Sequence, residues 1–168
     1  MKTIKVVLLT LLMLLPGLPV TAQDSAAPPA LFMSLEDIES GLRQAAAGSA
    51  SAAGWSVTIS PGITVRRRSS AVDQYAVMHP YSMEIYRILE GSGTLVTGGR
   101  IIGELEQTTE DVLRTPHGIE GGLARQVKEG DILVLQPGTP HWFSHIDGDT
   151  ITYMESRVRI VTHPVRYQ

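Results

Sequence analysis

The sequence predicts an all-β fold of the sandwich or barrel type, preceded by one short helix. Three observations lead to this prediction. From Trp55 onward the chain consists of about ten short extended runs, whereas apolar residues at helical spacing occur only before that point. Turns rich in Gly and Pro separate most of these runs. The length of 168 residues suits a single domain.

The first 22 residues predict a signal peptide for export. Lys2 and Lys5 give a positive start, and residues 6–15 form an apolar run broken by a single threonine. Small residues at 20–22 then offer a cleavage site. The apolar run is shorter than the roughly 20 residues that span a bilayer. We therefore expect cleavage after residue 22 and a periplasmic or secreted mature chain that is not inserted in the membrane.

Composition excludes several classes of function. The chain has 14 basic and 17 acidic residues, a net charge of −3, and removal of residues 1–22 takes away two lysines and no acid, which leaves −5. A mildly acidic protein lacks the positive surface that binds nucleic acid or anionic lipid. The chain has no cysteine. Disulfides, thiolate catalysis, cysteine metal sites and a lipid-modified cysteine are therefore excluded.

A flexible arm and a helix are expected before the strands. Residues 23–33 are polar and rich in Ala and Pro, which favours a flexible arm. Residues 34–48 predict the helix, with Ser34 as its N-cap and Gly48 as its stop. The apolar stripe expected to face the core is Leu35, Ile38, Leu42 and Ala45.

The predicted β domain covers residues 55–165. Turns are expected at 90–92 and 147–148, among others, because these positions combine Gly with polar residues. Residues 100–122 form the one long connection without a clear pattern, and such a loop is usually functional or mobile. Candidate strands are residues 56–60, 64–68, 74–78, 84–89, 93–96, 124–128, 131–135, 142–145, 150–156 and 159–163.

Three consecutive arginines lie in one of the early strands. On an alternating strand Arg66 and Arg68 share one face, and Arg67 takes the other. We expect this run to form a solvated outer face. The alternative is that one of these arginines meets an anionic substrate.

Two segments, residues 79–93 and 130–143, carry the residues suited to chemistry. Each places a histidine at the edge of a strand beside a turn, and the first adds a carboxylate five residues after its histidine. His79, Glu84 and His141 together would make a half-occupied coordination sphere. Such a set suits a divalent transition metal, either Fe, Mn, Ni, Cu or Zn, and leaves open positions for water or substrate.

The alternation of strand residues extends this predicted site to its neighbours. Residues two apart on a strand face the same way, so positions that alternate with Glu84 and His141 should share an interior. By the same rule His145 faces with His141, and Tyr81 faces with His79 if the chain is extended there. The cavity lining predicted in this way is Tyr86, Ile88 and Phe143.

The two segments resemble the two motifs of the cupin superfamily. In the first, the histidine and the carboxylate precede a glycine at Gly91, and in the second Gly130 precedes Gly138 and His141 at the family's spacing. The sequence of residues 89–99, together with that of 119–122, is similar to the sequences of a subgroup of small bacterial cupins, many without an assigned activity. The resemblance covers roughly residues 55–160. It implies a jelly-roll barrel (double-stranded β-helix), a small-molecule ligand or substrate and a homodimer.

One departure from the family pattern weakens the predicted site. Cupin metal sites usually have a His-x-His pair in the first motif, and this chain has one histidine there. If His79 is the second of the pair, Val77 replaces the first; if it is the first, Tyr81 replaces the second. His145 and Tyr81 are the candidates for a fourth ligand or a catalytic group.

The leading hypothesis is a metal-binding cupin that acts on a small molecule in the cell envelope, as a dioxygenase, isomerase or lyase. The second is a non-catalytic cupin with a degenerate metal site that binds or senses a small ligand. The third is purely structural use of the barrel. The sequence leaves open whether the protein is an enzyme, which metal it holds and which substrate it takes.

Overall fold

The computed structural model describes residues 27–49 and 52–165. The expected export signal, residues 1–22, lies outside the described residues, as do residues 23–26 of the expected arm. The chain divides into two units, Met1–Ala30 and Leu31–Gln168. In the first unit, the described residues 27–30 are exposed and belong to neither helix nor strand. The second unit contains all the described helices and strands.

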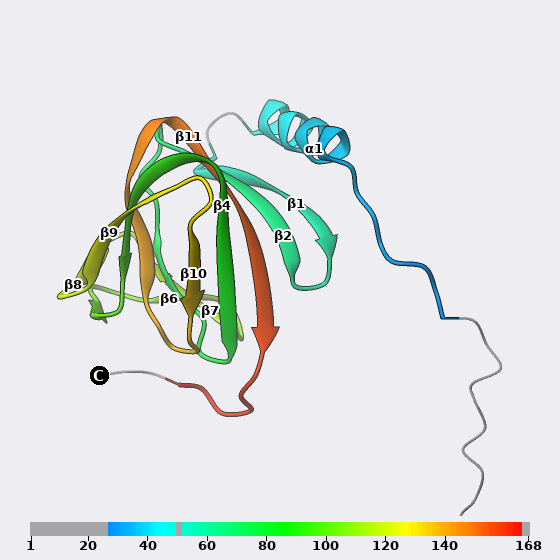
Figure 1. The fold of residues 1–168 in the computed structure, drawn as a ribbon. Coiled ribbons are helices and arrows are strands. Elements are labelled where there is room, and N and C mark those ends of the chain that lie inside the picture. The colour runs from blue at the N-terminus through cyan, green and yellow to red at the C-terminus, as the bar shows by residue number, and fades with distance from the viewer. Residues whose placement is uncertain (1–26, 50–51, 166–168) are drawn as a thin grey trace, which may run out of the picture. The chain divides into compact units, whose positions relative to one another are not determined.

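One helix and eleven strands make up the described part of the second unit (Figure 1). The all-β class predicted from the sequence is therefore confirmed. The helix is α1 (Leu35–Gly48), and the strands are β1 (Gly54–Ser60), β2 (Ile63–Ser69), β3 (Ala76–Met78), β4 (Ser82–Thr97), β5 (Arg100–Ile101), β6 (Glu106–Thr109), β7 (Val112–Thr115), β8 (Ile119–Glu120), β9 (Leu123–Lys128), β10 (Ile132–Leu135) and β11 (His141–Arg159).

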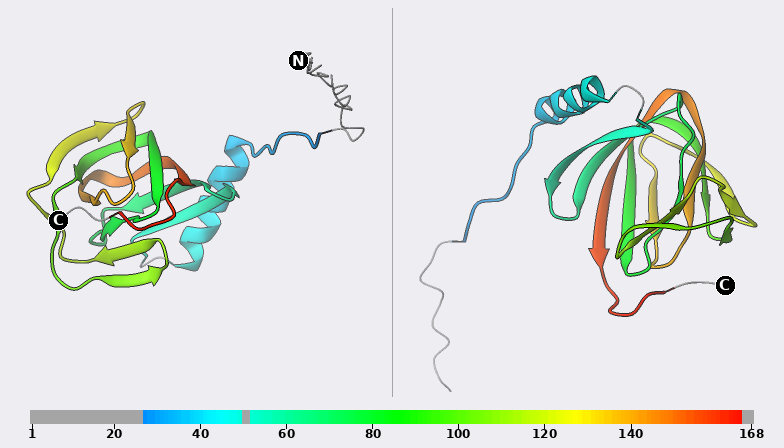
Figure 2. Two further views of the ribbon diagram at one scale, coloured as in Figure 1. Left: turned by 90° about the horizontal axis from the view of Figure 1, so that it is seen from below. Right: turned by 180° about the vertical axis from the view of Figure 1, so that it is seen from behind.

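The main sheet is organised around its two longest strands. Strand β11 pairs with β2, β3 and β4, and β4 pairs in addition with β9 and β10. Strand β1 lies outside β2, whereas β7 and β6 lie beyond β3, and all of these pairings are antiparallel. The sheet curls round on itself into the predicted jelly-roll barrel, as the two further views show (Figure 2). The barrel interior can therefore hold residues from distant parts of the chain.

Two of the predicted turns are instead points where long strands bend. Strand β4 continues through residues 90–92, and β11 continues through 147–148. Gly91 has a left-handed φ of +79°, and a Cβ on it would lie 2.5 Å from the carbonyl oxygen of Thr150. A Cβ on Gly93 would lie 2.5 Å from the carbonyl oxygen of His145. These glycines let β4 and β11 approach closely where the barrel turns a corner.

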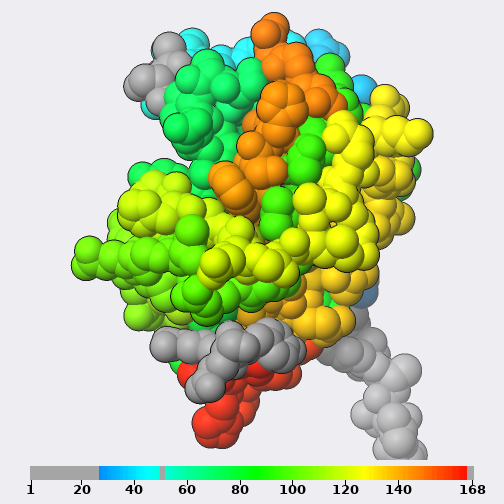
Figure 3. Space-filling model, turned by 90° about the vertical axis from the view of Figure 1, so that its left-hand side faces the viewer, coloured from blue at the N-terminus to red at the C-terminus, as the bar shows by residue number. Residues whose placement is uncertain are grey.

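The connection at residues 100–122 is more ordered than its sequence suggests. It contains β5, β6, β7 and β8, and β7 joins the main sheet through β3. Figure 3 shows this segment in yellow-green across the lower half of one face, below the orange bend of β11. The pairing of β7 with β3 brings the β6–β7 turn next to the first motif. The expectation of one long loop without strands is therefore wrong.

Helix α1 begins after Ser34, whose hydroxyl oxygen accepts a hydrogen bond from the Asp37 amide at 3.1 Å. Its buried stripe is narrower than predicted, since Leu42 is buried whereas Leu35 is 74% exposed. The helix lies against β1, where a Cβ on Gly41 would come within 2.7 Å of the Val57 side chain. In the described part of the chain, no helix has the length and apolar character needed to cross a membrane.

Candidate metal site and its pocket

Strand pairing brings the three predicted ligands together although they are far apart in the sequence. His79 follows β3, Glu84 lies near the start of β4, and His141 opens β11. In the antiparallel ladders His141 is opposite Val77, and Glu84 is opposite Arg157. The first motif and the two ends of β11 therefore meet at one place inside the barrel.

The three side chains form a compact buried cluster. Nε2 of His79 lies 3.4 Å from Oε1 of Glu84, and Nε2 of His141 lies 3.3 Å from Oε2 of Glu84. One ligand atom from each residue lies within 4.8 Å of the others. Glu84 is 1% exposed, and both imidazoles are also buried, with their ring centroids 5.5 Å apart. The structure thus gathers the predicted set of two imidazoles and one carboxylate.

Backbone carbonyls fix the tautomer of both histidines. Nδ1 of His79 donates to the carbonyl of Asp111 at 2.6 Å, and Nδ1 of His141 donates to the carbonyl of Thr139 at 3.1 Å. Because a carbonyl can only accept, each ring carries a proton on Nδ1, and in its neutral form it presents a lone pair on Nε2. Burial lowers the pKa of His79 to about 3 and outweighs the attraction of Glu84, so this ring is neutral at neutral pH.

Asp111, in the β6–β7 turn, anchors the first motif. Its carboxylate accepts hydrogen bonds from the backbone amide of Tyr81 at 2.7 Å and from the hydroxyl of Ser82 at 2.5 Å. Its carbonyl holds His79, as described above. Asp111 therefore orients the imidazole from outside the metal-ligand set. Sequence reasoning missed this residue because it lies in the connection that showed no strand pattern.

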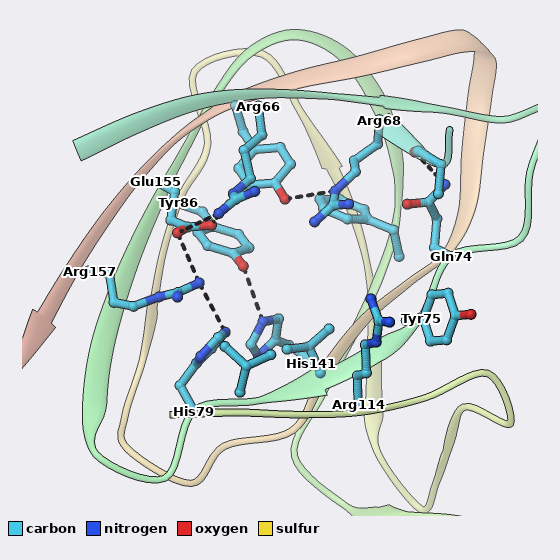
Figure 4. Close-up of a pocket in the computed structure, with 15 residues that line it drawn as sticks. Arg66, Arg68, Gln74, Tyr75, His79, Tyr86, Arg114, His141, Glu155 and Arg157 are labelled. Carbon is cyan, nitrogen blue, oxygen red and sulfur yellow. Dashed lines mark hydrogen bonds and ion pairs between the residues drawn. The ribbon is translucent and has the colours of Figure 1, made fainter. Parts of the chain in front are cut away.

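Arg157 lies in direct contact with two of the three candidate ligands. Its Nε donates to Oε1 of Glu84 at 2.8 Å, and an Nη donates to Nε2 of His79 at 3.1 Å. It also pairs with Glu155 at 3.0 Å, and Glu155 in turn pairs with Arg66 at 2.6 Å. Two carboxylates and two guanidinium groups thus alternate from Glu84 along the barrel wall, and Figure 4 shows the last three of them, Arg157, Glu155 and Arg66. Glu155 and Arg157 lie outside both motifs, so sequence reasoning missed them.

The residues present fit a divalent metal ion. Oε2 of Glu84 is buried and has no hydrogen-bond partner in the described part of the chain. An orphaned carboxylate oxygen beside an imidazole lone pair is a costly arrangement that a cation would relieve. Two imidazole nitrogens and a carboxylate oxygen also suit divalent transition metals. An ion here would use the His79 lone pair that Arg157 now uses, so the ion and the guanidinium compete for this atom.

A cavity of about 250 Å³ lies beside the cluster (Figure 4). Tyr86 and Phe143 line it as predicted, whereas Ile88 is 1% exposed and packs in the apolar core. The Tyr86 hydroxyl reaches Nε2 of His141 at 3.1 Å. Val77, one of the two positions considered for the missing histidine, also lines the cavity. A small molecule in this cavity would lie against the candidate ligands.

Arg66 and Arg68 line the same cavity, so the expectation of a solvated outer face is wrong for them. The alternation itself holds, because Arg67 lies on the other face and pairs with Glu39 at 3.0 Å and with Glu90 at 2.9 Å. The inner face of β2 therefore carries Arg66 and Arg68, and the outer face carries Arg67. Because both faces of the strand carry arginine at positions 66–68, the sequence pattern cannot show which face lies inside the barrel.

The two candidates for a fourth ligand lie outside the cluster. The Tyr81 ring packs under the guanidinium of Arg159, with 4.2 Å between the guanidinium carbon and the ring centroid. The His145 side chain is 70% exposed and lies 3.4 Å from Asp147. A bulge explains this placement, because the strand register shifts between Phe143 and His145 and leaves one extra residue on β11. Beyond a bulge the alternation of faces reverses, so His145 points outward.

No protein-family model matches this chain, and no curated protein matches it in sequence. Solved structures with partial likeness include the protein BH2720 from Bacillus halodurans, which is 16% identical with a TM-score of 0.46 over 82% of this chain and 88% of that one. A formate complex of oxalate decarboxylase from Lactobacillus farciminis is 13% identical with a TM-score of 0.37, over 64% of this chain and 31% of that one. With TM-scores below 0.5, these likenesses add nothing to what the strand pairing of this barrel already establishes.

Proposed function

We propose that the protein is a metal-binding cupin that holds a divalent transition-metal ion at His79, Glu84 and His141. The observation that carries the proposal is the buried cluster in which two Nε2 lone pairs face a carboxylate with one orphaned oxygen. When bound, such an ion supplies Lewis acidity and open coordination positions to a small molecule in the adjoining cavity.

The chain's own residues would control charge and protons around that molecule. Glu84 supplies negative charge to offset the ion, and its ladder partner Arg157 lies at the same carboxylate. Burial and the neighbouring Glu84 raise the pKa of Tyr86 well above its usual value, so its phenol stays protonated and acts as a hydrogen-bond donor at neutral pH. Dioxygenase, isomerase and lyase activities all remain within this proposal.

A second candidate is a non-catalytic cupin that binds or senses a small ligand. The observation in its favour is that Arg157 already occupies Oε1 of Glu84 and Nε2 of His79 through hydrogen bonds. A guanidinium in this position supplies positive charge to the buried carboxylate without an ion. The cavity would then serve for binding alone.

Elemental analysis of the purified protein separates the two candidates. We expect close to one transition-metal ion per chain in the wild-type protein and loss of the ion in His141→Ala. The matched control is His117→Ala, an exposed histidine outside the cluster, which should keep the ion. If the wild-type protein takes up no metal after incubation with Fe, Mn, Ni, Cu or Zn, the metal proposal is overturned and the binding function is favoured.

We propose in addition that the chain is exported, on the basis of the charged start and short apolar run of residues 2–15. N-terminal sequencing of the protein from the producing cells should show a chain that begins at Gln23. An intact N-terminus in the cytoplasmic fraction would contradict export.

We also propose that the protein forms a homodimer, as the resemblance implies. Apolar side chains on the outer face support an interface, among them Ile132 at 65% exposed, Val134 at 54% and Val158 at 51%. Light scattering should give twice the mass of the chain, and a monomer mass at high concentration would contradict the proposal.

A further inference from the structure

Four guanidinium groups line the cavity, and two of them are balanced inside the barrel. Arg66 pairs with Glu155, and Arg157 pairs with both Glu155 and Glu84. Burial disfavours the charged form of Arg66, but the hydrogen bond to Glu155 more than compensates and raises the pKa of Arg66 above its usual value. These four residues together carry no net charge.

The third guanidinium group lies at the more exposed side of the cavity. Arg114, on β7, pairs with Glu106 through two hydrogen bonds of 2.8 and 2.9 Å. Its guanidinium carbon also lies 4.7 Å from the centroid of the Tyr75 ring. Since Glu106 is exposed, solvent screens this pair, and Arg114 keeps part of its positive charge for the cavity.

The fourth guanidinium group, that of Arg68, has no carboxylate partner among the described residues. Its Nε donates to the hydroxyl of Tyr153 at 3.2 Å, and it makes no other side-chain contact of hydrogen-bond or ion-pair type within those residues. The side chain is half-buried and faces the cavity. A guanidinium removed from water without a counter-charge is costly, so a ligand anion would be stabilised beside it.

The charges around the cavity therefore favour an anionic ligand. Among the described residues, four guanidinium groups line the cavity, and three carboxylates pair with them, those of Glu84, Glu106 and Glu155. A divalent metal ion would add two further positive charges. Figure 4 shows Arg68 and Arg114 extending toward each other from opposite walls, with His79 and His141 on a third side. One ligand could contact both arginines and still reach the histidines.

We propose that the substrate or ligand is a small organic anion, a carboxylate or a phosphate ester, whose charged group is held by Arg68 with help from Arg114. The rest of the molecule extends toward His79 and His141. At about 250 Å³ the cavity is smaller than the roughly 300–1,000 Å³ typical of pockets for drug-sized ligands. This inference rests on the proposed function for what happens at the histidines, but not for the binding of the anion.

Calorimetric titration with three probes tests this assignment. Malonate and inorganic phosphate are the anions, and malonamide is the uncharged match of malonate. We expect at least one anion to bind the wild-type protein roughly tenfold or more tightly than malonamide, and Arg68→Gln to remove most of that difference. Arg87→Gln is the control, because Arg87 is exposed on β4 and does not line the cavity; it should behave as wild type.

Two further variants separate recognition of the anion from a structural effect at Tyr153. Tyr153→Phe removes the hydrogen bond to Arg68 but keeps the guanidinium, so anion binding should persist. Arg68→Lys keeps the charge without the planar fork and should bind the anion more weakly than wild type but more tightly than Arg68→Gln. Anions that bind no better than malonamide, or equally well to Arg68→Gln, would overturn the inference.

The titrations are run on metal-loaded and on chelator-treated protein. If the anion binds through Arg68 and no metal binds, the proposed metal function fails and the anion site stands. If metal binds and neither anion binds, the anion site fails and the metal function stands.

Discussion

Arg157 on β11 and Glu84 on β4 are direct partners in the antiparallel ladder, and their side chains meet with 2.8 Å between Nε and Oε1. The carboxylate is 1% exposed, and such a buried charge requires a partner. Arg157 is that partner in the structure, and a metal ion would be an alternative one. The competition between the Arg157 guanidinium and a metal ion therefore determines which of the two neutralises Glu84.

Replacement of Arg157 should shift this balance toward the metal. In Arg157→Gln the buried Glu84 loses its counter-charge, so we expect the metal-free protein to lose on the order of 3 kcal/mol of stability. Because the competing cation is gone, added metal should raise the melting temperature of the variant by more than it raises that of wild type. Differential scanning calorimetry with and without metal measures both effects. An equal or smaller rise in the variant would contradict the competition.

Removal of the Asp111 carboxylate should weaken metal binding without removing a ligand. Asp111→Ala loses the hydrogen bonds to Tyr81 and Ser82 that hold the β6–β7 turn in place, and the carbonyl that orients His79 belongs to that turn. We expect metal affinity to fall by about 10–100-fold. Competition against a chelator measures the affinity. Glu129→Gln, at an exposed turn, is the control, and an Asp111→Ala affinity equal to that of the control would remove Asp111 from the support of the site.

His145 should be dispensable for metal binding. The bulge in β11 turns its side chain outward, where it is 70% exposed. We therefore expect His145→Ala to bind metal as tightly as the wild-type protein does. In His79→Ala, the metal affinity should fall by about 100-fold. The same chelator competition measures both affinities. A fall of similar size in both variants would show that His145 is a metal ligand.

The metal-free protein should lose stability as the pH falls below about 6.5, in part because of His79. Its pKa is about 3 in the folded state and 6.5 when unfolded, so the unfolded state binds more protons between these values. The contribution of His79 to stability is complete above the higher pKa and falls by roughly 1.4 kcal/mol per pH unit within the window. Urea denaturation with chelator, at pH 7.5 and 5.0, measures it. His79→Gln should show the shallower pH dependence, and identical slopes would refute this assignment.

Much of the fold and the three candidate ligands could be predicted from local sequence pattern. His79, Glu84 and His141 lie at strand edges beside turns. Such positions can be predicted from the sequence because Gly and Pro mark the turns. The bends at Gly91 and Gly148 misled the same reasoning. A glycine needed for close approach of two strands has the same sequence signature as a glycine in a turn. The sequence therefore predicts four short strands, at 84–89, 93–96, 142–145 and 150–156, where the structure has the two long strands β4 and β11.

The residues around the ligands were harder to predict because long-range pairing determines their contacts. Arg157 reaches Glu84 through the β4–β11 ladder, and Asp111 reaches His79 through the pairing of β7 with β3. No local pattern encodes either contact. Arg68 shows a different limit, since alternation predicted that it shares a face with Arg66 but could not say that this face is the inner one.

The extra residue in β11 reverses the alternation of the strand, and the bend at residues 147–152 restores it. His141 and Phe143 before the bulge are buried, as is Ile146 after it, whereas Tyr153 and Glu155 beyond the bend return to the alternation of His141. Deletion of Ser144 would remove the first of these two shifts, so that either His141 or Ile146 would turn towards the solvent. An exposed serine that touches no ion and no ligand therefore keeps His141 on the inner face of the barrel.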